Sequence, residues 1–229
     1  LFSREGLHVG LWSELAPTPL VAFSLVIALA MSSILVTVGL WTRLGIVLTL
    51  VLRIYLYGID LINEKVIHTV AMIVLVILFF SPCHRLFSLD VVRNKAIKLN
   101  YAPSLWRQLI LLEVAQVYFF AGLVKLVSKD WWEGTTLFNV MQGRWATDSG
   151  LWLGSWLPFW CYGALSCATV LFELSAFLLF IRRYRLRYAL YAFIFHLGIQ
   201  LTLYIEVLGY HFMWILFTLV IIPATEERW

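Results

Sequence analysis

Seven long apolar runs dominate this sequence, and most are long enough to cross a lipid bilayer as a helix. They cover residues 20–40, 43–62, 66–81, 104–127, 157–182, 187–206 and 209–224. Only 13% of the residues are charged and 62% are hydrophobic, whereas a soluble domain carries about 25% charged residues. The sequence therefore predicts an all-α fold, a polytopic transmembrane bundle of about seven helices, in a single domain over residues 1–229.

Basic residues are distributed unevenly between the two sides of this helical path, which predicts its orientation. One side holds few of them: Arg4, Lys65, Lys129 and Arg144. The other side receives Arg43, Arg85, Arg93, Lys95, Lys98, Arg107, Arg182, Arg183, Arg185, Arg187 and Arg228. Because cytoplasmic loops are enriched in Lys and Arg, we expect the richer side to be cytoplasmic. Leu1 is then external and the C-terminus cytoplasmic, and an external start favours one more helix upstream of Leu1.

Two long connections interrupt the apolar runs. Residues 82–103 are basic and predict a short amphipathic stretch around Leu86 to Val92. Residues 128–156 form a predicted external loop that is rich in tryptophan, which suits an aromatic belt at the membrane surface. A lid over a site is the alternative interpretation of this loop.

Lys125 lies inside the fourth apolar run, where a charged side chain costs a few kcal/mol. A chain tolerates such a lysine when its amine reaches a polar partner, water or a substrate. An amine kept neutral by apolar surroundings can act as a general base or a nucleophile. The alternative is a buried stem whose amine extends to the outer interface.

Two histidines are candidates to share an outward-opening cavity with Lys125. His68 opens the third run from the outer side, and His196 lies at mid-depth in the sixth run with Gln200 one turn away. Histidines in such a cavity can relay protons or stabilise an oxyanion. An interfacial position for His68 and an interhelical hydrogen bond for His196 remain the alternatives. Glu173, in the fifth run, requires a partner or a proton, and the sequence does not indicate which.

Common signatures of other chemistry are not found in the sequence. It has no glycine-rich phosphate loop, no GxSxG elbow and no HExxH pair, and its three cysteines lack metal-ligand spacing. We therefore predict no metal site. The net charge of +4 arises from loop residues, so we expect lipid and other membrane protein subunits as partners and no nucleic acid.

The stretch from Val117 to Leu126, followed by Asp130-Trp131-Trp132-Glu133-Gly134, resembles the HTTM family. This is the membrane domain shared by vitamin K-dependent gamma-glutamyl carboxylase and many bacterial proteins. Shorter stretches elsewhere are also similar to the family: Leu1 to Leu7, Gly39 to Arg43, Phe87 to Asp90, Glu173 to Phe180 and Phe195 to Leu197.

The resemblance implies an activity and a location. In the carboxylase, the lysine that matches Lys125 deprotonates vitamin K hydroquinone, and histidines that match His68 and His196 assist it. We therefore expect Lys125, His68 and His196 to be catalytic, a quinone or quinol to be the cofactor or substrate, and the bacterial inner membrane to be the location. The sequence departs from the carboxylase pattern at Ile67, where an asparagine is usual, and at Val124, where a second lysine is usual. The lumenal β-rich domain of the carboxylase has no counterpart in this sequence.

The sequence leaves open whether the protein is an enzyme. One alternative is a non-catalytic accessory or structural subunit of a larger membrane complex. Another is a peptide-maturation membrane protein that resembles sporulation-delaying-protein B, and a third is a DoxX-like quinone-associated subunit.

Overall fold

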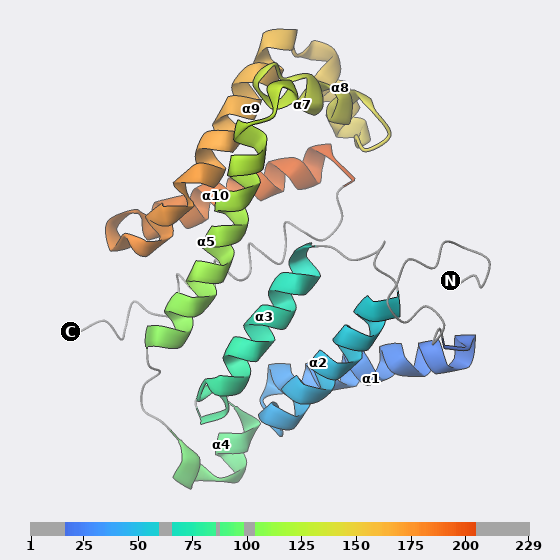
Figure 1. The fold of residues 1–229 in the computed structure, drawn as a ribbon, viewed down its shortest axis with the longest axis vertical. Helices are drawn as coiled ribbons and strands as arrows, with labels where there is room; N and C mark the ends of the chain where they lie inside the picture. Colours follow the sequence, from blue (N-terminus) through green and yellow to red (C-terminus); the bar gives the residue numbers. More distant parts are fainter. Residues whose placement is uncertain (1–16, 60–65, 86–87, 99–103, 205–229) are drawn as a thin grey trace. The chain divides into compact units, whose positions relative to one another are not determined.

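The computed structural model describes residues 17–59, 66–85, 88–98 and 104–204. Within these ranges every named element is a helix, and the only pairing of extended residues is one bridge between Ala146 and Leu203. This confirms the predicted all-α class. The chain forms two compact units, Leu1–Trp106 and Arg107–Trp229, and each is described by itself (Figure 1).

Four helices in the described ranges are long and apolar enough to cross a membrane: Pro19–Val38, Thr42–Ile59, Leu105–Leu126 and Phe159–Phe180. They coincide with the first, second, fourth and fifth predicted runs. The third run forms the shorter helix α3 (Val66–Phe80). Residues 187–202 of the sixth run lie in α10 (Arg182–Thr202), which begins with several arginines. The predicted seventh run lies outside the described residues.

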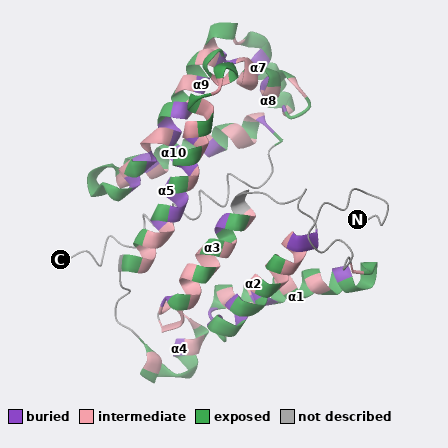
Figure 2. Ribbon diagram, in the orientation of Figure 1, coloured by how far each residue is buried: buried purple, intermediate pink, exposed green. Residues whose placement is uncertain are grey.

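The first unit is built on an antiparallel hairpin of α1 (Pro19–Val38) and α2 (Thr42–Ile59), with α3 packed beside α2 (Figure 1). A buried hydrogen bond from Thr49 Oγ1 to Ser32 Oγ, 2.9 Å long, joins the two helices of the hairpin. Most of α1 is not buried, as Figure 2 shows, and Ala22 and Ser32 are the buried residues of this helix. An exposed apolar face of this length suits contact with lipid chains.

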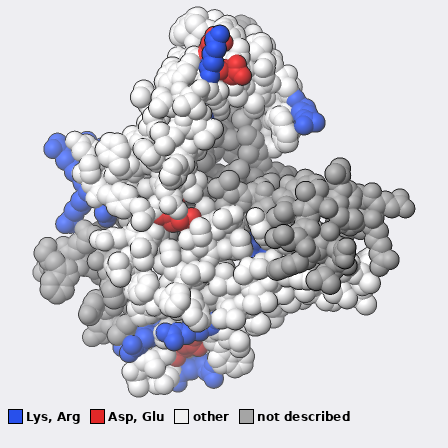
Figure 3. Space-filling view, viewed as in Figure 1, with Lys and Arg blue, Asp and Glu red and all other residues white. Residues whose placement is uncertain are grey.

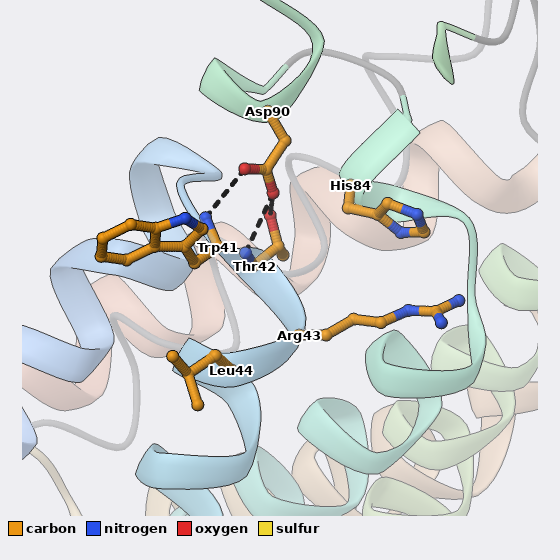
Figure 4. A pocket seen from close by; sticks show the side chains of 6 residues that line it. All are labelled: Trp41, Thr42, Arg43, Leu44, His84 and Asp90. Carbon is orange, nitrogen blue, oxygen red and sulfur yellow. Dashed lines mark hydrogen bonds between the residues drawn. The ribbon is translucent and has the colours of Figure 1, made fainter. Parts of the chain in front are cut away.

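The tight turn between α1 and α2 is held by the short helix α4 (Leu89–Arg93). The Asp90 carboxylate accepts hydrogen bonds from the backbone N–H groups of Trp41 and Thr42, at 2.9 and 3.0 Å, and from Thr42 Oγ1 at 2.9 Å (Figure 4). Asp90 thus caps the first N–H groups of α2 from a distant segment. Gly39 is required in the turn because its φ is +68° and a Cβ there would lie 2.4 Å from Ser88 Cβ.

We predict that this carboxylate makes the first unit sensitive to acid. Burial alone raises the pKa of Asp90, but the hydrogen bonds from Thr42 and Trp41 and the charge of Arg93 outweigh it and lower that pKa below 3.8. The stabilisation that Asp90 provides is therefore complete above pH 3.8, the ordinary pKa of this carboxyl group. It is lost as the pH falls through the lower pKa that Asp90 has in the folded protein. Asp90→Asn should destabilise the protein by about 1 kcal/mol near pH 7 and lose less stability than the wild type between about pH 5 and about pH 3. Thermal unfolding in detergent measures both the loss of stability near neutral pH and its pH dependence. Parallel pH curves for the wild type and Asp90→Asn would show that Asp90 is not the acid-sensitive group.

The second unit is formed by α5 (Ser104–Leu126), α9 (Phe159–Leu174), η4 (Ser175–Phe180) and α10, with α10 crossing α5 at an angle (Figure 1). Residues 128–156 lie beside one end of α9. The prediction of a loop for this segment is wrong, because it folds into α6 (Lys129–Trp132), α7 (Thr135–Gln142) and α8 (Asp148–Trp156).

Two local features explain why the connection is helical. Thr147 caps α8, since its side chain accepts a hydrogen bond from Gly150 N at 3.0 Å. Gly134 precedes α7 with φ +79°, and a Cβ there would lie 2.4 Å from Gly163 N, so only glycine lets this turn pack on α9. Met141, Tyr162 and Leu203 form a small buried core beneath these helices.

Candidate functional site

One face of α5 carries two polar side chains that bond to other helices of the second unit. Tyr118, Gly122 and Lys125 follow one another at intervals of four and three residues, which places them on one side of the helix. Tyr118 and Gly122 are buried and Lys125 is half-buried. The same face meets α9 and α10, so side chains from three helices converge there.

The amine of Lys125 is bound by a carboxylate on α9. Lys125 Nζ lies 2.7 Å from both oxygens of Glu173, and the side chains are 19% and 8% exposed. The same nitrogen lies 5.1 Å from the centre of the Trp131 ring, close enough for a cation–π contact. The amine is therefore held by protein groups, in contrast to the alternative of a lysine that extends to the interface.

Gly122 allows α5 to approach α9 closely at this point. A Cβ at position 122 would lie 3.0 Å from Glu173 Cβ and 3.0 Å from the backbone nitrogen of Leu174. Contacts this short leave little room for any larger side chain. The glycine brings Glu173 up to the helix surface, and Lys125, one turn further along α5, then reaches its carboxylate.

His196 is bound to a tyrosine on the same face of α5. Its Nε2 lies 2.6 Å from the hydroxyl oxygen of Tyr118, and both residues are buried. The Tyr118 ring packs against Phe172 at 5.3 Å and Tyr188 at 6.3 Å. Phe172 precedes Glu173 in α9, so the Tyr118–His196 and Lys125–Glu173 contacts belong to one buried region. The interhelical hydrogen bond, which was the alternative to a catalytic role for His196, is present, and Tyr118 is its partner.

His68, the third predicted catalytic residue, lies in the first turn of α3 and is half-buried. It belongs to the first unit, whereas Lys125 and His196 belong to the second. The catalytic role of His68 beside Lys125 stays a prediction.

The sequence interpretation missed three members of this region. Glu173 was expected to have a partner, but Lys125 was not identified as that partner. Trp131 was assigned to the aromatic belt and not to this region, and Tyr118 received no role, although it precedes Lys125 by two turns of one apolar helix. That spacing was the available signal.

The pair can hold or move a proton. Over 2.7 Å the ammonium proton of Lys125 can pass to Glu173, which converts two charges into a neutral amine and a neutral acid. A buried ion pair is weak evidence for stability, because the desolvation of both charges offsets most of their attraction. The arrangement therefore places an amine and a carboxylate at a distance that permits proton transfer between them.

Comparison with known proteins identifies the family. The model of the HTTM domain matches residues 7–225, which is nearly the whole chain and includes the Lys125 stretch and both histidines. No curated protein and no solved structure matches the chain. The described helices and the family match both indicate that this is a membrane protein. The chain belongs to the HTTM domain family.

Proposed function

We propose that this protein is a carboxylase-like membrane enzyme in which Lys125 removes a proton from a lipid-soluble, quinol-like substrate. Glu173 is the resident partner of the amine, and His196, held by Tyr118, and His68 are the assisting groups. The observation that supports this most is the amine of Lys125, which is shielded from water and bound by a carboxylate at 2.7 Å.

Proton transfer within the pair prepares the base. The ammonium of Lys125 gives its proton to Glu173, which leaves a neutral amine and a neutral carboxylic acid. The amine then accepts the hydroxyl proton of the substrate and becomes an ammonium beside the substrate anion. The total charge is unchanged in both steps, so neither step leaves a net charge in a region of low polarity.

The residues around the amine are largely aromatic, which favours an aromatic substrate. The Trp131 ring lies over the amine, and the rings of Tyr118 and Phe172 pack on the same side of α5. Tyr118 and His196 supply a hydroxyl and a ring nitrogen that can hydrogen-bond a quinol oxygen. These groups combine an apolar ring surface with a few polar atoms, as ligand sites do.

A turnover assay tests the proposal. The purified protein in lipid nanodiscs is given a reduced isoprenoid naphthoquinone under air, and the oxidised and epoxidised products are measured by mass spectrometry. We expect turnover by the wild type and a loss of about 100-fold or more in Lys125→Met, the usual contribution of a general base. Lys129→Met is the matched control, because Lys129 lies one turn away and its side chain is 84% exposed.

The outcome also separates the enzyme from an accessory subunit. Naphthoquinone turnover that is equal in the wild type and Lys125→Met, or absent from both, would overturn the proposed chemistry. A subunit without catalysis should keep its partners and its cellular function in Lys125→Met, provided that this variant unfolds at the temperature of the wild type.

A further inference from the structure

A second candidate site lies in the first unit, where the turn between α1 and α2 meets α4. A hollow of about 430 Å³ opens there, lined by Trp41, Thr42, Arg43, Leu44, His84 and Asp90 (Figure 4). It adjoins the ends of two helices that are long enough to cross a membrane, so it lies at the membrane surface. Nothing in the proposed chemistry of Lys125 uses this hollow.

The charged wall of the hollow favours an anion. The Arg43 side chain extends beneath the ring of His84, and Arg43 has no carboxylate partner among the described residues (Figure 4). Both oxygens of Asp90 accept hydrogen bonds from Trp41 and Thr42, and no ion pair joins this carboxylate to Arg43 in the part of the chain that the structure describes. Figure 3 shows that Lys and Arg side chains gather around α4 in this unit.

His84 experiences the same excess of positive charge. Burial lowers its pKa, and the charges of Arg43 and Arg85 lower that pKa further, whereas Asp90 acts in the opposite direction. Its Nδ1 is buried and has no hydrogen-bond partner among the described residues. An anion between Arg43 and His84 would pair with the guanidinium and accept a hydrogen bond from the imidazole, and its charge would favour protonation of His84.

The remaining wall is apolar and faces outward. Trp41 is 56% exposed and Leu44 is 53% exposed, although both are large hydrophobic residues. The Arg93 guanidinium lies 5.5 Å from the centre of the Trp41 ring and adds a further positive charge beside it. An aromatic and an aliphatic side chain next to arginines at the membrane surface match the glycerol backbone and phosphate of a lipid.

We propose that this hollow binds the phosphate headgroup of an anionic membrane lipid, with Arg43 as the main phosphate ligand and Trp41 and Leu44 against the lipid's apolar part. Free phosphate offers the same charge but would leave the apolar wall uncovered. The site is independent of the chemistry proposed for Lys125, so either proposal can fail alone.

Native mass spectrometry of the detergent-purified protein tests this site with three probes: phosphatidylglycerol, phosphatidylcholine and inorganic phosphate. We expect the wild type to retain phosphatidylglycerol with an affinity about tenfold higher than phosphatidylcholine, and Arg43→Gln to lose this preference. Arg43→Lys should keep part of it, because the charge remains. Arg144→Gln is the matched control, since Arg144 also lies beside a tryptophan ring, 5.1 Å from the centre of Trp145.

Three results would overturn the site. Equal retention of the two lipids by the wild type would show that charge does not select the occupant. Binding of inorganic phosphate with no preference for phosphatidylglycerol would replace the lipid by a free anion. An unchanged preference in Arg43→Gln, with Arg144→Gln reducing it instead, would place the lipid elsewhere.

Discussion

Glu173→Ala is expected to destabilise the protein by about 3 kcal/mol, because it leaves the Lys125 amine without its carboxylate in a region that water reaches poorly. The Lys125 side chain is only 19% exposed, so bulk solvent cannot fully replace the lost partner. Adding Lys125→Met should restore most of this loss. A methionine fills the space of the lysine stem without a charge, and a well-packed apolar pair is often as stable as a buried ion pair.

A double-mutant cycle measures this coupling. The free energies of unfolding of the wild type, Glu173→Ala, Lys125→Met and the double variant give the interaction energy directly. The exposed pair Lys129–Glu133, 3.4 Å apart and separated by four positions in the chain, supplies the control cycle and should give about 0.3–0.5 kcal/mol. Coupling between Lys125 and Glu173 as small as in this control would mean that the amine is solvated, and the proposed base would lose its physical basis.

The helical fold was predictable from the sequence because each candidate membrane span is a long run with few charged residues. The break between α1 and α2 was also visible, since Gly39 takes the left-handed conformation that ends a helix. The start of α10 was harder to place. Its first turn is made of arginines, which form helices readily but do not extend an apolar run.

The helices of residues 128–156 could not be predicted in the same way. The tryptophans of this segment are typical of a membrane-surface belt whether or not the backbone is helical. What folds it is tertiary contact: Gly134 packs on the backbone of α9, and the Tyr162 hydroxyl donates a hydrogen bond to Gly154 O at 2.9 Å. Contacts between segments distant in sequence leave no periodic pattern.

Lys125 was found because a charged residue inside an apolar run is conspicuous, whereas its pairing with Glu173 leaves no such signal. By the rise of an α-helix, Glu173 lies about 21 Å from the start of α9, whereas Lys125 is next to the last residue of α5. Counting residues from the end of each helix therefore places Lys125 and Glu173 at different depths in the membrane. In the structure the first part of α9 packs on α6 and α7, beyond the end of α5, and this offset brings the middle of the fifth run level with Lys125.

The Tyr118–His196 bond illustrates a related limit. A tyrosine within an apolar helix is most simply explained by packing, and its hydroxyl gives no directional signal in the sequence. Only the crossing of α10 over α5 brings Nε2 to 2.6 Å from the hydroxyl oxygen. Which residues lie on one helix face was therefore predictable, while the contacts between helices were not.

The close approach of α5 and α9 gives a second large effect. Gly122→Val should destabilise the protein by about 3 kcal/mol, because its side chain must displace the backbone of α9 at Leu174 as well as the Glu173 side chain. The displacement should also lengthen the Lys125–Glu173 contact. We therefore expect the coupling energy between these two residues to fall towards zero in a Gly122→Val background.

Gly198→Val provides the matched comparison for this change. Gly198 also lies within a helix of the second unit, but a Cβ there would meet no heavy atom within 4 Å. The same side chain therefore finds open space at position 198 and a closed interface at position 122. If thermal unfolding placed both variants at the same stability, the helices would have room to separate. The position of the amine would then depend on its carboxylate alone and not on the glycine that brings the two helices together.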